Sequence, residues 1–438
     1  MNTRRWAGLV AAACVLAAAA GCNGTSSKAG SAAAPADPAK VTGDITVLTA
    51  RTDLVSDGTL DKYAAEFSKT YPNVHVKFQG ITNYEGDVKI RLNSSNYGDV
   101  LLIPAALSRS DYPKFFASLG TQADLDAKYR FVANGTYNGQ VYGIAQNGNA
   151  NGFVYNKAVW AAAGVTDWPK TPDEFLADLQ AIKTKTQATP YYTNYHDGWP
   201  VSSFGGAVGS VSCDPKANDG LATTDAPWAS GKELNTIDTL LYNMVNRKLT
   251  EADPTTTNWE NSKSLIATGK IATMFLGSWA ISQMQAAATK AGAKPDDIGF
   301  MPWPGQKDGK FCPVIGPDYL QGISLKSDHK EAARAWLDWF TDKSPYAQDN
   351  GDVPTLKSAA LPTSIKPFQD AGATFVELSQ DKAATVNNID NAAEIGLAKP
   401  DYRQKIVDIA RGAASGTLDS DFADLNKKWG AAVKTAGS

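Results

Sequence analysis

The side chains that most often perform catalysis or bind metals are sparse in this chain and lie in no familiar catalytic spacing. Among 438 residues there are three histidines, His75, His196 and His329, and none belongs to a His-Glu-x-x-His sequence, the spacing of zinc hydrolases. No Gly-x-Ser-x-Gly sequence offers a serine nucleophile, and no Gly-Lys precedes Ser or Thr as in a phosphate-binding loop. Carboxylate pairs are numerous but none stands out, so a hydrolase with two spaced acids stays open. We expect no metal, no cofactor and no enzymatic activity.

Aromatic side chains in loops are the stronger signal. Eleven Trp and sixteen Tyr are many for this length, and several lie beside Gly, Asn, Asp or Pro, which are typical of turns. Trp279 follows a Gly-Ser pair at the end of an apolar run, and Trp199 lies between Gly198 and Pro200. Loop aromatics often form binding surfaces, although each can equally anchor its loop on the core.

The N-terminus has the composition of an export signal. Arg4 and Arg5 precede the apolar run 7–20, and the sequence Ala-Ala-Gly leads to Cys22. A charged head, a short apolar segment and small residues at the cut predict a signal peptide over residues 1–21, too short to span a membrane. The cysteine at the cut resembles the lipobox of bacterial lipoproteins, which implies that Cys22 carries a diacylglycerol. Ordinary secretion with cleavage nearby is the alternative.

The composition of the remaining chain argues against several classes of protein. Removing two arginines with the signal leaves 40 basic residues against 45 acidic ones, a formal charge of −5. Both signs are scattered, so there is no basic stripe for nucleic acid, and no later apolar run reaches the length of a membrane span. Cys213 and Cys312 also remain, and an even pair in an exported protein predicts a disulfide, with two buried thiols as the alternative.

Periodicity places these residues on alternating strands and helices. Residues 22–42 are rich in Gly, Ser, Ala and Pro and predict a flexible linker. The next sixty residues have the β-α-β-α-β pattern of a parallel sheet. Its strands are expected at 45–48, 73–80 and 99–104, with helices at 58–70 and 85–95. Later helices are expected at 171–182, 231–248, 258–268, 278–292 and over 402–434, with a strand at 271–276.

Several short sequences follow one another in a characteristic order. They are Asp99-Val100-Leu101-Leu102, Tyr142-Gly143-Ile144-Ala145, Val154-Tyr155-Asn156-Lys157, Pro169-Lys170-Thr171, Thr268-Gly269-Lys270-Ile271, Gly277-Ser278-Trp279, Pro302-x-Pro304-Gly305 and Gly351-Asp352-Val353-Pro354. Their order over residues 44–430 resembles the extracellular solute-binding proteins that feed bacterial carbohydrate ABC importers, the family that includes maltose-binding protein. The polar segment 146–152 is longer than the family's usual crossing strand, and Trp160 stands where an aliphatic residue is common.

The resemblance implies an α/β fold with two lobes of the type II periplasmic-binding-protein kind, joined by hinge crossings. The crossings are expected near residues 145, 314 and 343, so both lobes are discontinuous in sequence. Lobe one is expected to comprise 43–145 plus 315–342, and lobe two 146–314 plus 343–438.

The resemblance also suggests which residues meet a sugar between the lobes. Sugar binding needs flat apolar rings for C–H faces and planar polar groups for hydroxyls. Trp279 occupies the position of the family's stacking aromatic, Trp199 that of an aromatic cleft loop, and Tyr319 follows the second crossing. The polar candidates lie in the loop after the first strand or at the crossings: Arg51, Asp53, Asn147, Asn149 and Asp352. The alternative for each is a structural role in the core or in a solvated turn.

Together these features predict an extracytoplasmic receptor, lipid-anchored to the outer face of the cell membrane. We expect it to capture a carbohydrate, a di- or oligosaccharide, and to deliver it to the permease subunits of an ABC importer. The expected protein is a monomer that meets the membrane only through its lipid and binds no nucleic acid. Two alternatives stay open: a sensor lipoprotein that docks to a signalling partner, and an anchored polysaccharide hydrolase.

Overall fold

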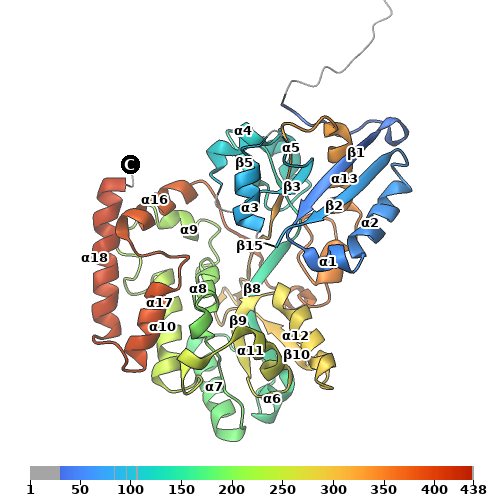
Figure 1. The fold of residues 1–438 in the computed structure, drawn as a ribbon. Coiled ribbons are helices and arrows are strands. Elements are labelled where there is room, and N and C mark those ends of the chain that lie inside the picture. The colour runs from blue at the N-terminus through green and yellow to red at the C-terminus, as the bar shows by residue number, and fades with distance from the viewer. Residues whose placement is uncertain (1–29, 83, 95, 105–106, 437–438) are drawn as a thin grey trace, which may run out of the picture.

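The computed structural model describes residues 30–82, 84–94, 96–104 and 107–436, which form two α/β bodies joined by extended segments (Figure 1). We call the body that contains β1 lobe one and the body that contains β9 lobe two. The candidate signal peptide and Cys22 lie outside the described residues. Within the described part of the chain, no helix has both the length and the apolar character needed to cross a bilayer.

Lobe one is built on a five-stranded sheet with the strand order β2-β1-β3-β14-β7. β1 runs parallel to β2 and β3, as the β-α-β-α-β pattern predicts, whereas β14 is antiparallel to β3 and β7. The sheet is therefore completed by a strand from much later in the chain. The strands are β1 (Gly43–Thr49), β2 (Val74–Gly80), β3 (Val100–Leu102), β7 (Ile144–Ala145) and β14 (Leu320–Ile323).

Helices cover this sheet with their apolar faces. α2 (Thr59–Ser68) buries Leu60 and Phe67, which are two turns apart on one face, as an amphipathic helix requires. Phe67 meets Trp336 of α13 (Lys330–Asp342) edge to face, with ring centroids 5.3 Å apart, a favoured aromatic arrangement. Further helices of this lobe are α1 (Thr52–Ser56), α3 (Tyr84–Arg91) and α14 (Tyr346–Asn350).

Lobe two contains a second five-stranded sheet, centred on β8 (Gly148–Asn156). β8 pairs antiparallel with β9 (Thr273–Gly277), β10 (Ile298–Met301) and β13 (Val314–Pro317), and β13 pairs parallel with β15 (Val376–Glu377). The main helices around it are α7 (Pro172–Lys185), α8 (Trp199–Ser202), α10 (Glu233–Asn246), α11 (Trp259–Ala267), α12 (Trp279–Lys290), α16 (Ala383–Ala393), α17 (Asp401–Ala410) and α18 (Leu418–Ala436).

Three neighbouring segments connect the lobes. The first runs from β7 into β8, where Gly148 exchanges two backbone hydrogen bonds with Val353 of the third segment, each 2.7 Å from N to O. The second runs from β13 to β14, and its Asp318 N–H donates to Asn147 O at 3.0 Å. The third follows α14, because Tyr346 still belongs to the core of lobe one. The two lobes are therefore joined by three extended crossings, and further contacts lie beside them: Phe131 N–H donates to Glu377 Oε2 at 3.1 Å, and Arg109 Nη2 donates to Gln380 O at 2.8 Å.

Residues 30–42, the second part of the expected linker, lie against lobe one. Ala32 is 2% exposed, and its N–H donates to Ser118 O at 2.8 Å. The buried Arg334 donates from Nη1 to both Ala32 O and Leu119 O, at 2.7 Å each. The chain is therefore held on the lobe from this segment onward.

Cys213 and Cys312 form a disulfide with Cα atoms 5.4 Å apart. The bond lies in lobe two beside Val314 and Val376, in a small apolar cluster. It ties the irregular loop before α9 (Ala217–Gly220) to the segment that leads into β13.

Candidate ligand-binding site

Three indole rings of lobe two are in mutual contact, and we call Trp199, Trp259 and Trp279 the tryptophan cluster. The ring centroids are 4.9 Å apart for Trp199 and Trp259, 5.7 Å for Trp259 and Trp279, and 5.8 Å for Trp199 and Trp279. The planes of the three pairs are inclined by 76°, 63° and 46°. The three rings are therefore inclined to one another and do not form a flat stacking surface. Trp199 is 39% exposed, and the other two rings are half-buried.

Each ring of the cluster belongs to the first residue of a helix. Trp199 begins α8, Trp259 begins α11 and Trp279 begins α12. A side chain at the start of a helix projects beside the end of the preceding loop, where it can meet a ligand without leaving its helix. The chain uses the same local construction three times to bring three rings together.

A glycine makes room for Trp279. A Cβ atom at Gly277 would lie 2.5 Å from two atoms of the indole ring, closer than any real contact, so the ring folds back over a position that only glycine can occupy. Between them, the buried Ser278 exchanges hydrogen bonds with Ala150 of β8: its N–H donates to Ala150 O at 2.8 Å, and its Oγ accepts from Ala150 N at 3.1 Å. The ring is thus fixed relative to the crossing strand.

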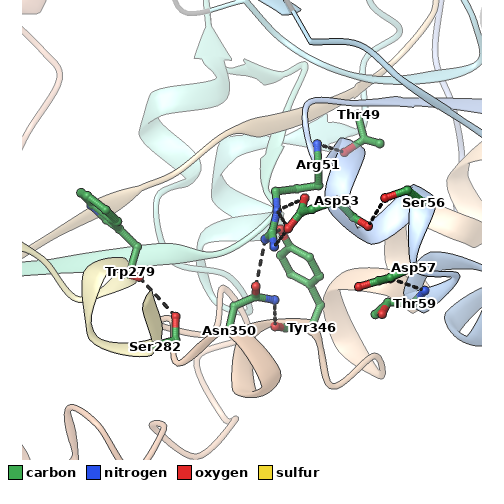
Figure 2. Close-up of polar contacts among 10 residues, drawn as sticks. All are labelled: Thr49, Arg51, Asp53, Ser56, Asp57, Thr59, Trp279, Ser282, Tyr346 and Asn350. Atoms are coloured by element: carbon green, nitrogen blue, oxygen red, sulfur yellow. Dashed lines mark hydrogen bonds and ion pairs between the residues drawn. The ribbon is translucent and has the colours of Figure 1, made fainter. Parts of the chain in front are cut away.

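Arg51 and Asp53 form the polar group of lobe one, at the start of α1 directly after β1 (Figure 2). The Arg51 guanidinium donates to both Asp53 carboxylate oxygens, from Nε at 2.9 Å and from Nη2 at 2.7 Å. Its Nη1 donates to Asn350 Oδ1 at 2.9 Å and to the Tyr346 hydroxyl at 3.3 Å. The bonds from Arg51 lower the pKa of Asp53, so this exposed carboxylate is ionised at neutral pH. Figure 2 shows Trp279 on α12, an element of the other lobe.

Asn147 and Asp352 meet at the hinge instead of on an open surface. Asn147 is 2% exposed and Asp352 is 4% exposed, and Asn147 Nδ2 donates to Asp352 Oδ2. Burial, and then the nearby Asp318 carboxylate, raise the pKa of Asp352 to about 7, against the opposing effects of the Asn147 bond and of Arg51. Within the described residues, neither Asn147 Oδ1 nor Asp352 Oδ1 has a hydrogen-bond partner. Their role as ligand contacts stays a prediction.

Tyr319 and Asn149 lie beside the hinge. The half-buried Tyr319 ring lies 6.1 Å from Tyr84, centroid to centroid, and Tyr84 is held by its hydroxyl, which accepts from Leu102 N at 2.8 Å. Burial and the neighbouring Glu85 raise the pKa of Tyr319, which keeps its hydroxyl protonated and able to donate. Asn149 is half-buried on β8, and its Oδ1 lies 3.5 Å from Ser278 Oγ, next to the tryptophan cluster.

Trp259 is the residue that the sequence interpretation missed. It lies within the helix expected at 258–268, and no binding role was predicted for it. The sequence feature that could have identified it is the residue before it. Asn258 caps α11 by accepting the Asn261 N–H at 2.9 Å, so Trp259 is the first residue of its helix, like Trp279. A search for aromatics directly after a helix cap identifies Trp259.

Other kinds of site are poorly supported in the described residues. No group of three or more His, Cys, Asp or Glu side chains there could hold a metal ion. Two small cavities of about 20 and 50 Å³ lie in lobe one, and Gln146 lines both of them.

Comparison with known proteins gives a consistent result. A model of the bacterial extracellular solute-binding proteins matches residues 52–347. A multiple sugar-binding protein of Streptococcus mutans is 26% identical over 296 residues, which are 65% of this chain and 68% of that protein.

Solved structures are more similar still. A manno-oligosaccharide-specific solute-binding protein from Bifidobacterium animalis subsp. lactis, in complex with mannotriose, is 33% identical with a TM-score of 0.79, over 90% of this chain and 95% of that one. An ABC transporter binding protein of the same organism, in complex with mannobiose, is also 33% identical with a TM-score of 0.79, over 93% and 97% of the two chains. These matches confirm the two-lobed type II fold that the sequence predicts.

Proposed function

Because the chain belongs to the bacterial extracellular solute-binding protein family, we propose that it captures a di- or oligosaccharide between its lobes and delivers it to an ABC importer. The observation that carries this proposal is the partly exposed tryptophan cluster of lobe two. Indole faces match the C–H faces of pyranose rings. The relatives that bind mannobiose and mannotriose support a sugar as the ligand.

The proposed mechanism is closure of the two lobes around the sugar. The tryptophan cluster supplies apolar contact from lobe two, while the ionised Asp53, held by Arg51, offers hydrogen-bond acceptors to sugar hydroxyls from lobe one. To convert a population that is 99% open into one that is 99% closed, the ligand must favour the closed form by roughly 5.5 kcal/mol. Two to four charge-assisted hydrogen bonds of about 1.5–3 kcal/mol each supply this difference, if they form only in the closed state.

Binding is tested by isothermal titration calorimetry and tryptophan fluorescence with mannobiose, mannotriose, raffinose and diacetylchitobiose. We expect at least one sugar to bind and to change the fluorescence. Trp279→Ala should weaken binding at least tenfold, because removing an aromatic contact in a binding site costs more than about 1.4 kcal/mol. The matched control is Trp168→Phe, since Trp168 packs on Phe311 and Phe368, outside the cluster. No response to any sugar, together with binding of peptides or metal ions, would overturn the proposal.

The same proposal includes the location and the state of the protein. We propose that Cys22 is lipidated, that the protein is an extracytoplasmic monomer on the outer face of the membrane, and that it has no catalytic activity of its own. The lipobox-like sequence at Cys22 and the family's extracellular role support this. Mass spectrometry of the N-terminal peptide from the membrane fraction tests the anchor. The Cys22→Ala variant should appear in the soluble fraction, and continued membrane attachment of that variant would contradict lipidation.

A further inference from the structure

We propose that Asp197 is a positioning residue that locks Trp199 and Trp259 together, so that the tryptophan cluster is complete before any ligand arrives. The inference rests on the proposed function, because it concerns the same sugar site. Asp197 ends the 3-10 turn Tyr195–Asp197, two residues before Trp199. Its carboxylate binds the backbone of Trp259, so its effect on a ligand would be indirect.

The first observation is a single short hydrogen bond. Asp197 Oδ2 accepts the backbone N–H of Trp259 at 2.7 Å. As the first residue of α11, Trp259 has an N–H with no partner inside its own helix, and a carboxylate at a helix N-terminus is favoured by the helix dipole. The side chain of Asn258 already accepts from Asn261. Asp197 therefore supplies a second cap, for the Trp259 N–H that Asn258 does not accept.

The second observation is that the Asp197 loop is rigidly attached to the lobe. The Tyr195 hydroxyl donates to Asp408 Oδ2 at 2.9 Å, and Gln404 Nε2 donates to Tyr195 O at 2.8 Å, so two residues of α17 hold the loop. The His196 N–H donates to Thr257 Oγ1 at 2.8 Å. A carboxylate anchored in this way fixes the start of α11 relative to α17.

The backbone after Asp197 completes the geometry. Gly198 has φ +74° and ψ −55°, a conformation that side-chain-bearing residues rarely adopt. A Cβ atom there would lie 3.1 Å from Pro400 Cγ. The turn aims Trp199 back at Trp259, giving the 4.9 Å centroid distance and the nearly perpendicular planes. The Asp197 side chain thus ties the start of α11 to the turn that carries Trp199.

A double-mutant cycle tests the inference with mannotriose as the probe in calorimetry. Asp197→Ala should weaken binding about tenfold, whereas Asp197→Asn should stay within about twofold of the unmodified protein, because an amide oxygen still accepts the N–H. If Asp197 acts through Trp259, the Asp197→Ala/Trp259→Ala variant should bind no more weakly than Trp259→Ala alone. The matched control is Asp253→Ala, which removes the cap of the adjacent turn Pro254–Thr256 and should bind like the unmodified protein. Additive losses in the cycle would overturn the inference.

A ligand-free readout separates this inference from the proposed function. Indoles in close contact couple and give a paired signal in circular dichroism, which should be present in the unmodified protein and in Asp197→Asn. It should be reduced in Asp197→Ala while the thermal transition remains cooperative. If mannotriose does not bind, that result counts against the proposed function and not against the role of Asp197. The circular dichroism tests that role separately: an unchanged paired signal in Asp197→Ala would refute positioning by Asp197.

Discussion

Replacing the hinge carboxylate should change how the stability of the protein depends on pH. Asp352 is buried at the third crossing with a pKa of about 7, and burial is the main cause of the increase from the ordinary value of 3.8. Between these two values the folded protein keeps a proton that the unfolded chain has released. Folding is therefore favoured at low pH, and this contribution is lost as the pH rises toward 7.

The magnitude follows from the same two values. Each pKa unit corresponds to about 1.4 kcal/mol, so the full effect above pH 7 is about 4 kcal/mol. Between pH 5 and pH 8, the contribution of this one group to the free energy of unfolding falls by about 2.5 kcal/mol. Asp352→Asn cannot ionise and should lack this part of the slope.

The assay is urea unfolding at several pH values, followed by circular dichroism. The difference in unfolding free energy between Asp352→Asn and the unmodified protein should shift by about 2.5 kcal/mol in favour of the variant from pH 5 to pH 8. Asn147→Ala removes a hydrogen bond that lowers the pKa of Asp352, so its transition should move to higher pH. Parallel pH profiles for the unmodified protein and Asp352→Asn would refute the reasoning.

Three further outcomes are expected. Gly277→Ala should displace the neighbouring indole of the tryptophan cluster, because its Cβ would lie 2.5 Å from the ring, and should weaken sugar binding about tenfold in calorimetry; unchanged affinity would contradict the close approach. Reduction of Cys213–Cys312, which spans 99 residues, should lower the free energy of unfolding by up to about 4–5 kcal/mol, measured by denaturation with and without reductant, and no change would count against a stabilising bond. Arg334→Lys should speed amide hydrogen exchange at residues 30–32, since an ammonium lacks the planar fork of the guanidinium; equal exchange rates would show that other contacts hold the segment.

The alternation of strands and helices was the part of the fold most readily predicted from sequence. β1, β2 and β3 coincide closely with strands expected from apolar patterning, and Thr171 caps α7 by accepting the Glu174 N–H at 3.1 Å. Composition was less informative about residues 30–42. Small residues permit flexibility but do not require it, and the side chain that holds this segment, Arg334, lies far away in sequence.

Residues of the candidate site could be predicted from the sequence only where their immediate neighbours along the chain indicate their position. Trp279 could be selected because a Gly-Ser pair precedes it directly after a strand, and the structure places it half-exposed in the cluster. The pairing of Asn147 with Asp352 depends on how the crossings lie against each other, which no spacing along the chain reveals. Trp259 was missed because a helical pattern hides a ring that projects from the first turn.

The two lobes differ in how firmly their candidate ligand-binding side chains are held in place without a ligand. In lobe two, Gly277 and the hydrogen bonds of Ser278 hold the Trp279 ring in place without any partner from lobe one. In lobe one, most donors of Arg51 are already engaged by Asp53, Tyr346 and Asn350, so within this polar group the exposed Asp53 carboxylate is the side chain that can still accept hydrogen bonds. A sugar bound to lobe two alone would gain apolar contact equally in the open and closed forms, and such contact cannot shift the equilibrium between them. In the proposed mechanism, the drive to close therefore comes from the contacts that the sugar makes with lobe one, because these form only in the closed state.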